Sequence, residues 1–107
     1  MEILSARSAF AALAQETRLA AFRLLVRAGP AGLPAGEIAR ALGTAPSTLS
    51  THLGLLQRAG LVSSERRSRR IVYRADFEGV GALMRFLMQD CCKGHPAVRA
   101  AIGGEAA

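Results

Sequence analysis

The chain holds two cysteines, Cys91 and Cys92, side by side in the stretch "DCCKGHP". Thiolates bind soft, thiophilic ions in preference to hard ones, so the pair predicts a site for such an ion. A direct disulfide is disfavoured, because neighbouring Cα atoms lie about 3.8 Å apart and relaxed bridges need about 4.4 Å. Two alternatives stay open: structural thiols buried at a helix end, or a redox switch through a disulfide between subunits.

A second group of residues suits hydrogen bonding to DNA. The segment "APSTLSTHLGLLQRAG" reads as a helix with an apolar stripe of Leu49, Leu53 and Leu56. Its other faces carry small hydroxyls and amides and no acid, which allows close approach to bases or phosphates. The candidates for DNA contact on this helix are Ser47, Thr48, Ser50, Thr51, His52 and Gln57. The alternative is an ordinary polar surface on which His52 only caps or packs.

Arginines crowd the segment that follows this helix. Five of them lie within nine residues, with Glu65 as the acid among them. Like charges on a small hairpin repel one another unless an anion compensates them, which favours a phosphate contact over a solvated charge run. The tip residue Arg69 suits insertion into a minor groove. The cluster comprises Arg66, Arg67, Arg69, Arg70 and Arg74.

Composition agrees with a nucleic-acid partner. The 107 residues include 14 Lys and Arg against 8 Asp and Glu, a formal charge of +6. The opening "MEILSARSAF" has no basic leader or cleavage site, and no apolar run approaches the roughly 18 residues of a membrane span. We therefore expect a cytoplasmic protein with reduced thiols and no membrane association. An enzyme is not expected, since no acid/base pair, nucleophile–base spacing or phosphate loop is present.

The helices and strands that position these residues are predicted from the spacing of apolar residues and from the glycines and prolines that end helices. The pattern predicts helices over residues 2–13, 16–28 and 33–43, the first two with apolar stripes of Ile3, Phe10 and Leu13 and of Leu19, Phe22 and Val26. Thr44 is predicted to cap a fourth helix that stops at Gly60. Strands over 61–66 and 71–74 flank an Arg67–Ser68–Arg69 turn. The order predicts a winged helix–turn–helix fold, mainly α with a β-hairpin wing, over residues 1–93, followed by a partly flexible tail over 94–107.

The last predicted helix, residues 77–92, carries an apolar stripe that reaches the cysteines. Cys91 falls on that stripe at i+14 from Phe77, and Cys92 lies about 100° further round. If the stripe faces a partner subunit, Cys91 lies at the edge of a dimer interface. The stripe comprises Phe77, Val80, Met84 and Leu87.

Taken together, these segments resemble a known family. "FAALAQETRLAAFRLL" resembles the opening two helices of ArsR/SmtB-type repressors, and "STLSTHLGLLQRAGLVSSERRSRRIVYRA" resembles their recognition helix and wing. The resemblance covers residues 8–92. It implies a homodimeric, cytoplasmic transcriptional repressor that dimerises through its first and last helices and leaves a double-stranded DNA operator when it binds an inducer.

Two metal sites common in that family are missing from this sequence. The third helix reads "GEIARAL", without the family's Cys-x-Cys box. On the last helix, Asp76 and Glu78 have no downstream histidine partners for the His/Asp site. Zinc, nickel or cobalt sensing at those positions is not expected.

The cysteine stretch resembles the Asp-Cys-Cys-x-Gly-x-Pro-x-x-Cys motif of some arsenic-responsive members. Arg99 stands where the motif has its final cysteine, and trivalent inorganic arsenic prefers three thiolates. Two thiolates suit a species with one bond already occupied, such as a methylated trivalent arsenical. His95 is either a further ligand or a turn residue before proline. The matching residues are Asp90, Cys91, Cys92, Gly94 and Pro96.

The sequence thus predicts a DNA-binding repressor released from its operator when a trivalent arsenical or other thiophilic ion binds Cys91 and Cys92, with no organic cofactor. The alternative is an ArsR-type repressor regulated by redox, or with no metalloid inducer. A winged helix that serves as a protein-interaction adaptor is disfavoured, because adaptors usually lack an arginine-rich wing and an acid-free fourth helix.

Overall fold

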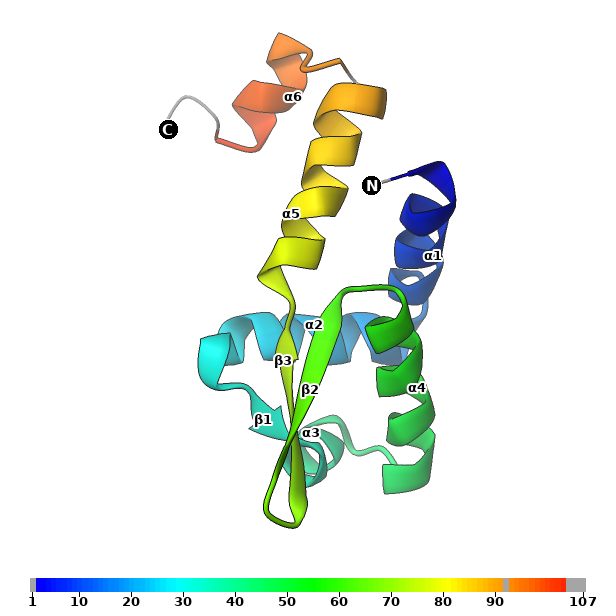
Figure 1. The fold of residues 1–107 in the computed structure, drawn as a ribbon, viewed down its shortest axis with the longest axis vertical. Helices are drawn as coiled ribbons and strands as arrows, with labels where there is room; N and C mark the ends of the chain where they lie inside the picture. The colour runs from blue at the N-terminus through cyan, green and yellow to red at the C-terminus, as the bar shows by residue number, and fades with distance from the viewer. Residues whose placement is uncertain (1, 92, 104–107) are drawn as a thin grey trace.

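The chain folds as a winged helix–turn–helix unit with a column of helices above it (Figure 1). The computed structural model describes residues 2–91 and 93–103, and for residues 3, 4, 90 and 91 the backbone alone. The predicted fold class, mainly α with a β-hairpin wing, is confirmed. In chain order the elements are α1 (Ile3–Leu13), α2 (Glu16–Ala28), the 3-10 turn η1 (Gly29–Ala31), β1 (Leu33–Pro34), α3 (Ala35–Leu42), α4 (Pro46–Arg58), β2 (Val62–Arg67), β3 (Arg70–Ala75), α5 (Phe77–Phe86), the π-helical turn η2 (Leu87–Cys91) and α6 (Pro96–Ala101).

A tight turn joins α3 to α4. Gly43 ends α3 with φ 62° and ψ 35°, in the left-handed region that favours glycine. Ala45 is the N-cap of α4, because Pro46 in the first turn restricts the preceding residue to extended backbone. The predicted cap at Thr44 is wrong: its Oγ1 donates instead to the Leu42 carbonyl oxygen at 3.4 Å.

The sheet has three antiparallel strands among the described residues, in the order β1–β3–β2, where the sequence predicts a hairpin alone. Leu33 pairs with Tyr73 and Pro34 with Val72, so β1 ties the wing to the helix–turn–helix. The assignment of residues 33–34 to the third helix is wrong, because the residue before a proline favours extended backbone. Gly32 approaches β3 so closely that a Cβ would collide with the Tyr73 carbonyl oxygen.

The wing is the hairpin of β2 and β3. The register runs from Val62 opposite Ala75 to Arg67 opposite Arg70. Two residues, Ser68 and Arg69, are left for the turn, and the predicted three-residue turn is wrong because Arg67 pairs within the ladder. Ser68 adopts φ 61°, an uncommon value for a residue with a side chain.

The core lies between α2, α3, α4 and the sheet. The predicted inward stripe of α4 is confirmed, since Leu49, Leu53 and Leu56 are at most 1% exposed. Packing with few voids holds these leucines in place and fixes the orientation of α4. The largest fully buried side chains are Leu25, Ile38, Leu49, Leu53, Leu56, Leu61 and Val62.

The stripes predicted for α1 and α2 are wrong in part. Phe10, Leu19 and Val26 are 43%, 42% and 40% exposed, respectively. Alanines take the inward positions because they allow the helices to approach closely, which leaves the larger side chains outside. The buried residues of these two helices are Ala6, Ala9, Ala12, Ala21 and Leu25.

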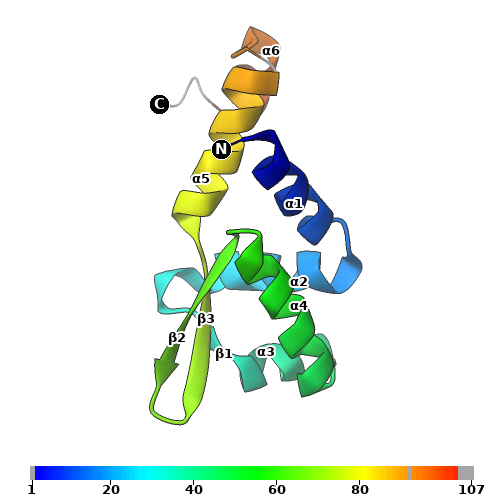
Figure 2. The ribbon, with the colours of Figure 1, turned by 45° about the vertical axis from the view of Figure 1, so that its right-hand side comes forward.

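Helix α5 rises away from the winged unit, and α1 rises beside it (Figure 2). The N–H of Gly79 donates to Asp76 Oδ1 at 3.1 Å, which caps the start of the helix. At Gly79 a Cβ would collide with the Gly60 carbonyl oxygen, so glycine permits the close contact at the base of α5. Among its described side chains Leu83 is buried, whereas Phe77 is 49% and Met84 40% exposed.

Beyond Phe86 the helix changes geometry. Residues 87–91 form the π-helical turn η2, whose hydrogen bonds span five residues rather than four. The prediction that Cys91 lies on the apolar stripe of α5 assumes 3.6 residues per turn. That spacing applies only as far as Phe86, so it no longer fixes the side of the helix on which Cys91 lies. The chain then turns, and residues 96–101, predicted as part of the tail, form α6.

Candidate DNA-binding surface

Helix α4 begins at the end of the molecule where α3 and the tip of the wing also lie (Figure 1). Its first turn contains no acid, and the four hydroxyl residues predicted to contact DNA are all exposed. Because a helix N-terminus presents unpaired N–H groups, this end of α4 favours an anionic partner. The four residues are Ser47, Thr48, Ser50 and Thr51.

Ser47, Thr51 and Gly54 follow one another at helical spacing on the side of α4 opposite its buried leucines. Thr51 Oγ1 donates to the Ser47 carbonyl oxygen at 3.4 Å, so the Thr51 hydroxyl proton is engaged within the helix while its oxygen can still accept a hydrogen bond. Gly54 adds no side chain of its own to this face, and the Arg58 guanidinium lies beside it, 3.7 Å from where a Cβ would stand. The geometry brings these three positions together on the outermost face of the helix.

Gln57 and His52 lie on opposite flanks of α4. The hydroxyl of Ser64 on β2 donates to Gln57 Oε1 at 3.2 Å, so Gln57 faces the wing. Arg18 Nη1 lies 3.2 Å from His52 Nδ1, so His52 faces α2. Arginine only donates, which places the His52 ring proton on Nε2. His52 and Gln57, which are predicted together with the four hydroxyl residues as candidates for DNA contact, therefore lie on the two flanks of the hydroxyl face.

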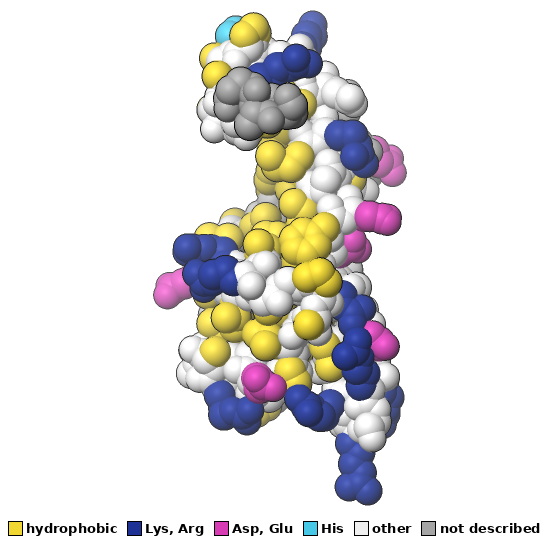
Figure 3. Space-filling model, turned by 90° about the vertical axis from the view of Figure 1, so that its left-hand side faces the viewer, with side chains coloured by type: hydrophobic (Ala, Val, Ile, Leu, Met, Phe, Trp, Pro, Cys, Tyr) yellow, Lys and Arg dark blue, Asp and Glu magenta, His cyan; other side chains and the backbone are white. Residues whose placement is uncertain are grey.

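The wing carries its arginines at and behind the turn. All four predicted contacts, Arg66, Arg67, Arg69 and Arg70, are exposed. Arg69 lies in the turn and forms no ion pair with a described residue. The space-filling view shows Lys and Arg side chains gathered around the wing end of the molecule (Figure 3). Hydrophobic side chains dominate the base of the column above it.

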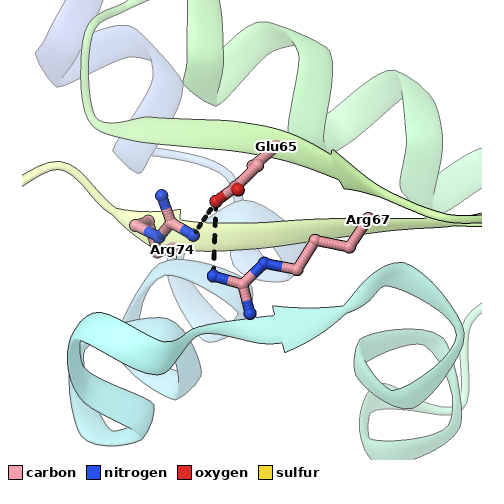
Figure 4. A network of polar contacts seen from close by, with 3 residues as sticks. All are labelled: Glu65, Arg67 and Arg74. Atoms are coloured by element: carbon pink, nitrogen blue, oxygen red, sulfur yellow. Dashed lines mark hydrogen bonds and ion pairs between the residues drawn. The ribbon is translucent and has the colours of Figure 1, made fainter.

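Glu65 binds two of the wing arginines (Figure 4). Its Oε1 lies 2.7 Å from Arg74 Nη2 and 3.3 Å from Arg67 Nη2. The hydrogen bond from Arg74, followed by that from Arg67, holds the pKa of Glu65 below its ordinary value. The Arg74 side chain is 26% exposed against 55% for Arg67. Arg74 is therefore a structural residue of the wing rather than an outward contact.

Glu37 of α3 binds the wing from the other side. Its Oε2 lies 3.3 Å from Arg70 Nη2, and a recess between α3 and the wing is lined by both residues together with Arg40 and Arg69. Arg40 extends the basic surface across α3. The sequence does not predict this role, because a single arginine on a short helix gives no signal until the fold places it opposite the wing.

The backbone of Cys91 ends the π-helical turn η2, away from the winged unit. Cys92 and the side chain of Cys91 are outside the described part of the chain. The predicted thiol site therefore stays a prediction from the sequence. His95 caps α6, because the N–H of Ala97 donates to His95 Nδ1 at 3.0 Å. This is the turn role that the sequence offers as one of two alternatives. Arg99 lies over Gly94, with its guanidinium about 3.6 Å from where a Cβ would stand.

The described residues contain no group of three or more His, Cys, Asp or Glu side chains placed to hold a metal ion. Within the same residues, no helix has the length and apolar character needed to cross a membrane.

A family model described as a helix-turn-helix domain matches residues 13–65. The chain is 35% identical over 69 residues to the HTH-type transcriptional regulator YgaV of Escherichia coli K12, covering 64% of this chain and 70% of YgaV.

Two solved structures share the fold over most of their length. An ArsR-like transcriptional regulator from Rhodococcus sp. RHA1 superposes with a TM-score of 0.73 at 32% identity, covering 96% of this chain and 93% of that one. The homodimeric winged helix-turn-helix DNA-binding domain Mb0332 of Mycobacterium bovis gives a TM-score of 0.65 at 28% identity, covering 86% and 85%.

Proposed function

Because the chain belongs to the ArsR family of winged helix–turn–helix transcriptional regulators, we propose that it is a homodimeric repressor released from its operator by a trivalent arsenical or other thiophilic ion at Cys91 and Cys92. One observation carries the DNA-binding half of this proposal. The uncharged hydroxyl face of α4 and the arginines of the wing lie at the same end of the molecule. A helix of this kind suits the major groove, and the wing suits the adjacent backbone.

The wing and α4 have separable roles in this proposal. Arg69→Ala and Arg70→Ala weaken binding to every DNA sequence and lower the salt slope by about one unit for each phosphate that the wing no longer neutralises. Arg85→Ala on α5 is the matched control, an exposed arginine on the upper column. Fluorescence anisotropy over a salt series measures the slope. An unchanged slope in both wing variants contradicts the wing contact.

Base reading by α4 is tested on selected and random DNA. Ser47→Ala, Thr48→Ala and Thr51→Ala lower specific affinity by about 1–3 kcal/mol wherever the deleted hydroxyl binds a base edge, with a smaller decrease on random DNA. Binding-site selection from a random pool supplies the specific sequence. Equal decreases on both DNAs contradict base reading and assign the hydroxyls to the backbone.

A second copy of the chain suits the exposed apolar residues of the upper column. Phe77 and Met84 of α5 and Phe10 of α1 stay 40–49% exposed in the single chain. Because these side chains are already about half-buried, each gains roughly half of the 1.5–3 kcal/mol that full burial of an exposed side chain gives. The homodimeric state of Mb0332 agrees with this assignment. We therefore place the dimer interface on α1 and α5.

The inducer half of the proposal rests on the stretch "DCCKGHP". Two adjacent thiolates bridge one metalloid atom with less compression than a direct disulfide requires. Fixing the end of the last helix changes the packing of a dimer interface, and small shifts there are amplified into rotation of DNA-reading helices. A coupling of about 1–3 kcal/mol weakens operator binding by roughly 5- to 150-fold.

Thiol variants test the inducer directly. Cys91→Ser and Cys92→Ser each keep normal operator affinity and dimerisation but are no longer released by trivalent arsenicals. Methylarsenite acts at lower concentration than arsenite, because two thiols are present. Arg99→Cys, at a position that lies over Gly94, improves the arsenite response. Release of the double serine variant by an arsenical contradicts the site.

The redox alternative predicts a different pattern. Peroxide then releases wild-type protein, a thiol reductant restores binding, and arsenicals have no effect once the reductant is removed. Electrophoresis without reductant shows a disulfide-linked dimer in that case.

A further inference from the structure

A cavity of about 400 Å³ lies between α1, the start of α2 and the flank of α4 that faces away from the wing. Ser8, Ala11 and Ala12 of α1 form one wall, and Leu55 and Ala59 of α4 form another. This volume falls within the roughly 300–1,000 Å³ of typical small-molecule sites. The walls are predominantly apolar, so they suit the body of a small organic ligand.

Two arginines complete the lining of this cavity, and no carboxylate of the described residues lines it. Arg18 is half-buried and Arg58 is exposed. Neither forms an ion pair with a described residue, whereas Arg70 pairs with Glu37 and Arg74 with Glu65. The cavity therefore has cationic charge without a counter-ion.

The bonds of Arg18 leave part of its guanidinium free for a ligand. Its Nε donates to the Ala12 carbonyl oxygen at 2.8 Å, and its Nη1 contacts His52. A guanidinium has five N–H donors, and the others have no acceptor among the described residues. A carboxylate accepts two parallel hydrogen bonds from such a fork.

We propose that this cavity binds a small amphipathic carboxylate, with its charge on Arg18 and Arg58 and its apolar body against Ala11 and Leu55. The site is separate from the thiols, and its occupant is a second ligand rather than the metalloid.

The position of Arg18 couples this site to α4. Its guanidinium joins the end of α1, through the Ala12 carbonyl, to His52 in the middle of α4. A carboxylate competes with His52 for Nη1 and draws the guanidinium toward the cavity. Breaking the Arg18–His52 hydrogen bond removes a side-chain tie that holds α4 against α2. Ligand binding thereby favours a conformation of the domain in which α4 is held less firmly and the affinity for DNA is lower.

The proposed dimer leaves this site open. Ser8 and Phe10 differ by two positions, which places them roughly 160° apart around α1. Phe10 lies on the flank assigned to the partner subunit, and Ser8 lies on the flank that lines the cavity. Both ligand and partner can therefore bind at once.

Calorimetry on the full chain, without DNA or arsenical, tests the site with benzoate and its neutral isostere benzamide. Benzoate is expected to bind once per chain, at least about tenfold more tightly than benzamide. Arg18→Met weakens benzoate binding by roughly ten- to a hundredfold. Ala11→Leu narrows the cavity with Arg18 intact, so it weakens binding comparably even if Arg18→Met proves unstable. Arg23→Met is the matched control, an exposed arginine of α2 that does not line the cavity.

Several results overturn the proposal. Equal affinity for benzoate and benzamide removes the role of the arginines. An unchanged affinity in Ala11→Leu places the ligand elsewhere. Absence of binding at millimolar benzoate, in folded wild-type protein, excludes the site.

Coupling is measured on the selected operator. Saturating benzoate weakens wild-type operator binding at least about fivefold and leaves Ala11→Leu unaffected. Unchanged wild-type affinity overturns the coupling. Failure of operator binding without benzoate counts against the proposed DNA function instead. Repeating the measurement in Cys91→Ser/Cys92→Ser separates both results from the arsenical response.

Discussion

The winged unit and helix α5 above it differ in how far their large apolar side chains are buried. Leu49, Leu53 and Leu56 of α4 are at most 1% exposed, whereas Phe77 and Met84 of α5 are 49% and 40% exposed. One set of apolar side chains is buried by its own chain, and the other stays available to a second chain. The fold of the domain and its proposed dimerisation therefore depend on separate residues.

The largest expected effect lies in the winged unit. Leu53→Ala removes a fully buried side chain and leaves a cavity, which lowers the free energy of unfolding by about 2–5 kcal/mol. Denaturant unfolding at several protein concentrations measures it. The comparison fails if Met84→Ala lowers the stability of the monomer as much as Leu53→Ala does.

The junction between the two regions comes next. Gly79→Ala introduces a Cβ that collides with the Gly60 carbonyl oxygen, so α5 must shift at its base. We expect the free energy of unfolding to fall by about 1–3 kcal/mol. Gly81→Ala is the control on the same helix, where the nearest atom to a Cβ is the end of the flexible Arg85 side chain at 3.8 Å. Equal stability of both variants would show that the α5 junction is pliable.

The upper column is tested by substitution at its exposed residues. Met84→Glu places a charge in the proposed interface and weakens dimerisation by at least about 1 kcal/mol, with little change in monomer stability. Sedimentation equilibrium measures the dissociation constant. Arg85→Glu is the adjacent control on the same helix. Dimers of Met84→Glu as tight as wild type would remove α5 from the interface.

The smallest effect concerns Glu65 in the wing. Glu65→Gln removes the ion pairs with Arg67 and Arg74, frees the exposed Arg67 and steepens the salt slope of DNA binding by up to about one unit. Overall stability changes little, since the site is a surface one screened by solvent. An identical slope in both proteins would show that Arg67 stays away from DNA.

The same variant has a pH signature. The folded-state pKa of Glu65 is lowered, so the contribution of its ion pairs to stability is full above the ordinary carboxyl pKa. That contribution is lost as the pH falls through the lowered pKa. Wild-type minus variant stability therefore declines only in acidic solution, which denaturant unfolding across a pH series measures.

The sequence predicts α4 well and α2 poorly, for a physical reason. In α4 the leucines form the one large apolar stripe, so the sequence indicates a single possible inward face. In α2 the stripe of Leu19 and Val26 competes with that of Ala21 and Leu25. Alanine is weakly hydrophobic, but close helix packing favours it, and that packing is a property of the whole fold. Strand β1 escapes prediction similarly, because two residues form a strand only by pairing with β3.

The candidate site shows the same division. The hydroxyl positions of α4 and the arginines of the wing follow from composition and local spacing. The partners of His52 and Glu37 do not, because Arg18 and Arg70 lie 34 and 33 residues away in the chain. Contacts at such separation are set by tertiary packing, so the sequence predicts a DNA contact for His52 but not its contact with Arg18 of α2.

The pairing of Leu33 and Pro34 with β3 has a consequence for operator architecture. This pairing joins the wing to the strand that leads into α3, and α3 packs against α4. The wing and α4 therefore move together as one rigid body. In the proposed complex, the distance between the groove contacted by α4 and the DNA backbone contacted by the wing is then fixed. A half-site lengthened by one base pair, roughly 3.4 Å, cannot be matched by bending of the wing alone. On such an operator either α4 or the wing disengages completely, rather than both binding more weakly.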